Sequence, residues 1–177
     1  MLESSYSSVS PSRWRELHDN LAGGLKEGIQ NRMTPANSSG VGMDALGYPC
    51  PVRGYLVFDG PPGSYAICPI CFWEDDIVQL GFPLMDGGAN RLSLHQSQQE
   101  FMRTGACEFR LKGHVRPAVD SDKRDPAWRL FDPASDPYLR WGSPEDSERW
   151  AAAEPGACLY YWRREYWLLS KGAVEPF

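Results

Sequence analysis

The chain has 177 residues, a formal net charge of −5, and a composition of 42% hydrophobic and 23% charged residues. This composition is ordinary for a globular protein, and the acidity argues against a protein that holds nucleic acid mainly through phosphate contacts. No apolar stretch is long enough for a signal peptide or a membrane span, so we expect a cytoplasmic protein with reduced thiols and no membrane partner.

The N-terminal residues 1–47 predict a helical arm followed by a linker. Ser10 and Pro11 are typical of a helix start, and apolar residues then recur at helical spacing from Trp14 to Ile29. We expect this stripe to pack against the rest of the chain, with docking on another protein as the alternative. Residues 34–47 are typical of a flexible linker.

Residues 48–117 predict a small module of two strands and a helix. Residues 54–58 and 64–67 favour a hairpin with its turn at residues 59–63. Such a hairpin would bring Cys50 to the same end as Cys68 and Cys71. Ser93 to Gln96 then fits a capping box, and Gly105 fits the end of that helix.

The composition changes again after Pro117. Residues 118–140 predict mostly loop, and Ser143 and Pro144 begin a short helix that ends at about Ala153. The bulky segments 158–162 and 166–169 predict a hairpin that turns at residues 163–165, with a terminal helix as the alternative. The predicted class is therefore α+β: a small hairpin module with flanking helices and a Trp/Tyr-rich C-terminal extension, residues 118–177, packed on it.

The cysteine spacing is typical of a zinc ribbon, in which two Cys-x-x-Cys turns supply four ligands. Cys68 and Cys71 form a complete second turn, whereas the first turn has Cys50 and then Arg53 at the position of the second ligand. A guanidinium only donates hydrogen bonds and cannot bind a metal. Three candidate zinc ligands remain, and the candidates for a fourth are His95, Cys107, His114, His18 or a water.

Two outcomes are open for the first turn. Arg53 could point outward and pair with Glu74, Asp75 or Asp76, which would leave zinc on the three cysteines. Alternatively, zinc has been lost and Cys68 and Cys71 are buried thiols. The three acidic residues also have a purely structural interpretation, because carboxylates in such a turn cap backbone donors.

Two motifs resemble those of the cysteine-rich CPCC family of small bacterial proteins. Residues 50–55 are Cys-Pro-Val-Arg-Gly-Tyr, and residues 68–76 are Cys-Pro-Ile-Cys-Phe-Trp-Glu-Asp-Asp. The likeness continues through residues 87–90, 93–94, 101, 105–107 and 115–117. The resemblance implies a zinc-ribbon-like fold whose first knuckle is degenerate, since Val52 and Arg53 stand where family members have cysteines. It implies no settled activity, although such proteins are often encoded near bacterial toxin and immunity proteins.

The first functional expectation is a non-enzymatic interaction or accessory factor, of an immunity-like kind, whose partner is another protein. The acidic loop and the aromatic extension would be its contact surfaces, and the aromatic residues also suit a homodimer. One alternative is a zinc-dependent hydrolase with an open zinc position and Glu74 as catalytic residue. The other is a nucleic-acid-binding ribbon. Phosphate-binding glycine loops and nucleophile motifs are missing from the sequence, so we predict no cofactor-binding residues beyond the metal ligands.

Overall fold

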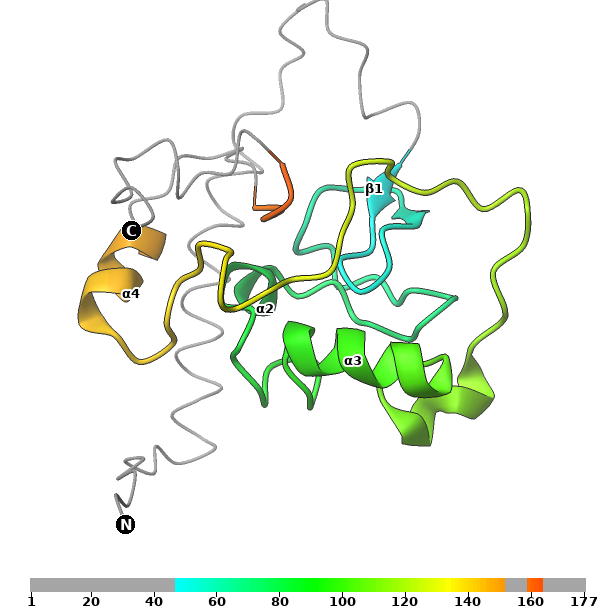
Figure 1. Ribbon diagram of the computed structural model, residues 1–177, viewed down its shortest axis with the longest axis horizontal. Coiled ribbons are helices and arrows are strands. Elements are labelled where there is room, and N and C mark those ends of the chain that lie inside the picture. The colour runs from blue at the N-terminus through cyan, green and yellow to red at the C-terminus, as the bar shows by residue number, and fades with distance from the viewer. Residues whose placement is uncertain (1–46, 152–158, 164–177) are drawn as a thin grey trace, which may run out of the picture.

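The computed structural model describes residues 47–151 and 159–163. Its elements are the strands β1 (Tyr48–Pro49) and β2 (Leu56–Phe58), the α-helices α2 (Ile77–Gly81), α3 (Leu94–Thr104) and α4 (Pro144–Ala151), and the 3-10 helix η2 (Phe109–His114) (Figure 1). This mixture of helices and a small two-stranded sheet is consistent with the predicted α+β class. The predictions for the N-terminal arm and for residues 164–177 lie outside the described residues.

The predicted hairpin between residues 54–58 and 64–67 is wrong. β2 pairs antiparallel with β1, with the first cysteine turn between them. Residues 65–67 instead fold back on residues 73–75: the Tyr65 amide donates to the Asp75 carbonyl at 3.2 Å, and Ile67 forms a bridge with Glu74. Each cysteine turn therefore closes its own short hairpin. The intervening segment includes two prolines, which have no amide to donate to a ladder.

Helix α3 has the predicted boundaries. The Ser93 hydroxyl accepts from the Gln96 amide while the Gln96 side chain accepts from the Ser93 amide, so the capping box is complete. Gly105 ends the helix with φ +84°, a left-handed conformation that favours glycine. Figure 1 shows α3 lying alongside the module that carries the cysteine turns.

Helix α2 was not predicted, although its cap has a sequence signal. The Asp76 side chain accepts from the Val78 and Gln79 amides, as an N-cap aspartate does. The helix is only five residues long and buried along its whole length, so it lacks the amphipathic period that identifies longer helices.

Helix α4 begins at Pro144 as predicted and packs on α2 through one aromatic side chain. Trp150 is buried, and its ring centroid lies 5.3 Å from that of Phe82. A Cβ added at Gly81 would lie 2.0 Å from the Trp150 ring. The absence of a side chain at Gly81 therefore permits this close approach.

Residues 159–163 form a turn, so the predicted strand over residues 158–162 is wrong where it is described. The Arg163 amide donates to the Tyr160 carbonyl at 3.0 Å. The four side chains before Arg163 are all buried, whereas a strand on the surface would alternate between buried and exposed positions. Tyr161 and Trp162 point to different partners, the Arg129 carbonyl and the Asp125 carboxylate respectively.

One buried cluster joins the cysteine turns to the segments that follow η2. It contains the cysteines together with Phe58, Trp73, Leu80, Phe131, Leu139, Trp150 and Tyr161. In Figure 1 the chain after η2 runs up one side of the module and returns across it before α4. Over the described ranges, none of the helices has the length and apolarity that crossing a bilayer requires.

Candidate metal centre

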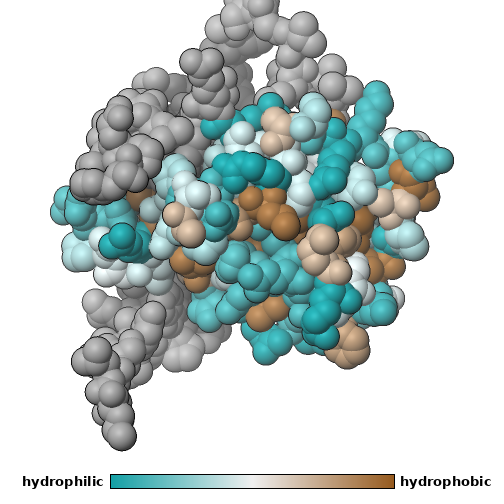
Figure 2. Space-filling model, viewed as in Figure 1, coloured by the Kyte–Doolittle hydropathy of each residue, from teal (hydrophilic) through white to brown (hydrophobic). Residues whose placement is uncertain are grey.

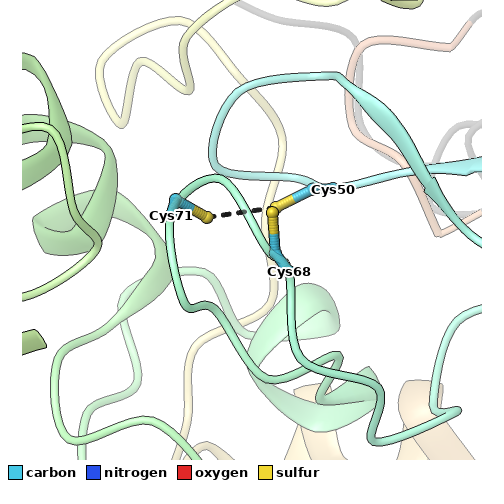
Figure 3. A group of neighbouring side chains, drawn as sticks. All are labelled: Cys50, Cys68 and Cys71. Atoms are coloured by element: carbon cyan, nitrogen blue, oxygen red, sulfur yellow. Dashed lines mark hydrogen bonds between the residues drawn. The ribbon is translucent and has the colours of Figure 1, made fainter. Parts of the chain in front are cut away.

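The structure brings Cys50, Cys68 and Cys71 together. Their sulfur atoms all lie within 4.8 Å of one another, and those of Cys50 and Cys71 are 3.5 Å apart (Figure 3). All three residues are at most 1% exposed. Because a Zn–S bond is about 2.3 Å long, two sulfurs on one tetrahedral zinc lie about 3.8 Å apart. The group therefore has the size and the donor atoms to hold a metal ion.

The first cysteine turn is intact in its backbone although its second ligand is missing. The Cys50 amide donates to the Tyr55 carbonyl at 2.8 Å, and the Gly54 amide donates to the Cys50 carbonyl at 2.6 Å. Gly54 has φ +73°, and a Cβ there would lie 2.3 Å from the Trp128 ring. Arg53 is the residue immediately before this left-handed position.

The second turn repeats the same pattern. The Cys68 amide donates to the Trp73 carbonyl at 2.8 Å, and the Phe72 amide donates to the Cys68 carbonyl at 2.9 Å. Phe72 has φ +69°, in the place that Gly54 takes in the first turn. Arg53 therefore occupies, in a correctly formed turn, the position that Cys71 occupies in the other.

The Arg53 side chain points away from the sulfur atoms and toward α3. Its guanidinium carbon lies 5.0 Å from the ring centroid of Phe101 and 5.6 Å from that of Trp128, and its Nη1 contacts the Met102 sulfur. Of the two outcomes left open for the first turn, the outward direction of Arg53 agrees with the first, but its contacts are with rings and a sulfur and not with Glu74, Asp75 or Asp76. Within the described ranges Arg53 stacks on aromatic rings and forms no ion pair.

The acidic residues after the second turn hold the backbone. Asp75 accepts hydrogen bonds from the Gly63 and Ser64 amides, and Asp76 accepts from the Ala89 amide as well as capping α2. Both aspartates are buried, and burial raises the pKa of Asp75. The structural interpretation of these two residues is confirmed, and they cannot form the acidic contact surface that we expected.

The candidates for a fourth ligand lie outside the sulfur group. The His95 ring packs edge-on against Phe131 and contacts Gln99, and His114 packs against Phe72. His18 is not among the described residues. Glu74, the candidate catalytic residue, is partly exposed and does not belong to the group.

Cys107 contacts the second turn through its backbone. Its amide donates to the Cys71 carbonyl at 2.6 Å, but its sulfur is not part of the group. Burial raises the pKa of Cys107 to about 12, so this thiol stays protonated at neutral pH. Cys107 therefore supports the second turn without contributing a sulfur to it.

The three clustered thiols perturb one another's pKa values. Hydrogen bonds from Cys50 and Cys71 lower the pKa of Cys68 to about 4, while burial raises the pKa values of the other two. Cys68 is thus the thiolate that its neighbours stabilise. Since thiolates rather than thiols bind metals, one ligand is already in its binding form at neutral pH.

A buried glutamine that sequence reasoning missed fixes the first turn in place. The Gln98 amide nitrogen donates to the Pro51 carbonyl and to the Tyr161 hydroxyl, both at 2.9 Å, and its oxygen accepts from the Phe131 amide at 3.0 Å. Trp128 donates a second hydrogen bond to Pro51 at 3.0 Å. A single glutamine on a helix carries no sequence signal for such a role.

The comparisons with known proteins bear on the central segment. Residues 48–122 match the model of the family described as cysteine-rich CPCC, a span that holds both cysteine turns, α2, α3 and η2. Searches of the curated proteins and of the solved structures found no match. The central segment of this chain, with Arg53 where the first turn would have its second cysteine, is therefore similar to the cysteine-rich CPCC family over residues 48–122.

Proposed function

We propose that this protein is a non-enzymatic interaction or accessory factor. In this proposal a zinc-ribbon-like module with a structural zinc holds a cationic, aromatic surface that contacts an acidic partner protein. The observation that carries the proposal is the direction of the Arg53 side chain. Arg53 occupies the ligand position of an intact turn, but its guanidinium lies on aromatic rings at the surface.

We call this surface the Arg53 patch, and its members are Arg53, Tyr55, Phe101, Met102, Arg124 and Trp128. The Arg124 guanidinium carbon lies 4.1 Å from the Trp128 ring centroid and 5.9 Å from that of Tyr55. Arg124 also donates to the Arg53 carbonyl at 2.7 Å, and Met102 is 59% exposed. Aromatic residues, methionine and arginine are the types enriched in protein contact surfaces, so the composition of the patch supports an interaction role.

The charge of the patch indicates what kind of partner it suits. Burial and the nearby Arg53 charge both lower the pKa of Arg124, which means that two cations lie close together. In the part of the chain that the structure describes, neither arginine has a carboxylate partner. The whole chain carries a net charge of −5, whereas the Arg53 patch is locally cationic. The positive charge of the patch favours a partner that presents carboxylates.

The sulfur group supports a structural metal rather than a catalytic one. A hydrolytic zinc needs an open coordination position and a general base beside it. Here the three cysteines are buried, and the group includes no carboxylate or histidine of the described residues. Three thiolates suit zinc, and holding both cysteine turns together would stabilise the surface that the first turn carries.

Charge reversal on the patch tests the proposal. We expect the partner that co-purifies with the wild type to be lost from Arg53→Glu and Arg124→Glu, because each places a carboxylate opposite the partner's carboxylates. Arg103→Glu is the control, since Arg103 is exposed on α3 and pairs with Glu100 outside the patch. Binding of the identified partner is then measured by calorimetry with the purified proteins. Equal binding by all variants, or substrate turnover that depends on Glu74, would contradict the proposal.

A further inference from the structure

A cavity of about 200 Å³ lies beside the second cysteine turn, between that turn, residues 89–92, α3 and η2. Its apolar lining includes Phe72 and Leu111, and its most buried lining residues are Ser97 and Cys107. At the volume that a water molecule takes in the liquid, the cavity has room for about seven heavy atoms. The cavity is thus suited to a small metabolite rather than a drug-sized molecule.

Ser97 gives the cavity a polar group that lacks a partner. The residue is fully buried, and within the described ranges its hydroxyl has no hydrogen-bond partner. The Ser97 backbone is satisfied, because its amide donates to the Ser93 carbonyl at 2.8 Å. Buried hydroxyls are normally paired, so an orphaned one that lines a cavity indicates a ligand that pairs with it.

Two arginines lie at the exposed edge of the cavity and converge on one buried carboxylate. Arg91 Nη2 and Arg110 Nε lie 2.5 Å and 2.6 Å from the same oxygen of Glu108, whose side chain is 6% exposed while theirs are 66% and 63% exposed. Burial opposes ionisation of Glu108, but hydrogen bonds from Arg110 and Arg91 outweigh it and lower its pKa. Glu108 therefore stays charged and holds both guanidiniums in place.

The arginines keep donors for a ligand. A guanidinium has five N–H groups in a planar fork that matches a carboxylate. In the described structure Arg110 gives Glu108 only its Nε hydrogen, and Arg91 gives Nε and Nη2. The lining also includes Glu74, so two carboxylates offset the two guanidiniums. This balance suits a monoanion better than a dianion such as phosphate.

We propose that the cavity binds a small monoanionic hydroxycarboxylate or oxocarboxylate of about four carbons. Its carboxylate contacts Arg91 and Arg110 at the edge, its carbon chain contacts Phe72, and its second oxygen pairs with the Ser97 hydroxyl. The proposal is independent of the Arg53 patch, which involves none of these residues.

The test is a titration of the full-length protein with 3-hydroxybutyrate. Binding is monitored through the chemical shifts of the backbone amides in nuclear magnetic resonance spectra. We expect shifts of amides around the cavity with a dissociation constant on the order of 1 mM, as befits so small a ligand. The neutral amide of the same acid and inorganic phosphate should each bind at least tenfold more weakly. Equal binding of phosphate would overturn the choice of ligand, and no shift around the cavity would overturn the site.

Variants connect the binding to the named groups. Arg110→Ala should weaken 3-hydroxybutyrate binding about tenfold or more, because it removes a charge-assisted hydrogen bond. Ser97→Ala should weaken 3-hydroxybutyrate but leave butyrate, which has no hydroxyl, unchanged. Arg103→Ala is the control and should bind like the wild type. If Ser97→Ala folds and binds both acids as the wild type does, the assignment of Ser97 is wrong.

Discussion

Replacing Arg53 by cysteine should restore a fourth sulfur ligand. The two cysteine turns have matching hydrogen bonds. In each of them the next residue, Gly54 after position 53 and Phe72 after position 71, has a left-handed backbone conformation. In Arg53→Cys the new sulfur should therefore lie where the first turn of a complete ribbon presents its second ligand. The change also removes the Arg53 guanidinium from the rings of Phe101 and Trp128.

Two opposing effects set the magnitude. Structural zinc sites with four ligands bind with an apparent free energy of about 10–16 kcal/mol, so one ligand contributes about 3 kcal/mol, or about a hundredfold in affinity. Each cation–ring contact at an exposed site contributes about 0.5–1 kcal/mol, and Arg53 makes two of them. Arg53→Cys should then be about 1–2 kcal/mol less stable than the wild type without metal, yet bind zinc more tightly.

The assay is urea unfolding with a chelator and with excess zinc, together with zinc affinity from chelator competition. Arg53→Ser is the matched control, because it loses the ring contacts without adding a thiolate. Both variants should lose stability equally in the chelator. With excess zinc both should gain stability through Cys50, Cys68 and Cys71, but only Arg53→Cys should gain more than the wild type does. If the two variants have the same zinc affinity, residue 53 does not face the sulfur group and the equivalence of the two turns is refuted.

Two further predictions concern stability. Gly81→Ala should lower the free energy of unfolding by about 1–3 kcal/mol, because its Cβ would collide with the Trp150 ring. Gly60→Ala, where a Cβ meets nothing within 4 Å, should change it by less than about 0.5 kcal/mol, and equal effects in chemical denaturation would contradict the packing of α4 on α2. The hydrogen bonds from Arg116 lower the pKa of Asp122 from 3.8 to about 2. The ion pair between Asp122 and Arg116 therefore contributes fully to stability above pH 3.8, and this contribution is lost as the pH falls through about 2. The stability difference between wild type and Asp122→Asn should therefore shrink over this pH window, and a constant difference would show that the ion pair contributes nothing.

Local signals in the sequence predicted those features whose cause is local. The capping box at Ser93, the glycine that ends α3 and the Pro144 start of α4 depend on residues within one helical turn. The spacing of the cysteine motifs predicted that Cys50, Cys68 and Cys71 meet, although the hairpin expected to bring them together does not form. The hairpin partners were wrong because alternation shows that a segment is extended without showing what it pairs with.

The sequence by itself determined that the chain carries two cysteine turns, one of them lacking a ligand, on an α+β module. Only the tertiary structure decided where Arg53 goes, because Trp128, which it stacks on, lies 75 residues further along the chain and follows a segment without regular structure. Likewise, only packing brings Ser97, Arg91 and Cys107 around one cavity. Helix caps and turns depend on residues that are neighbours in the sequence, whereas contacts between distant side chains depend on how the whole core packs.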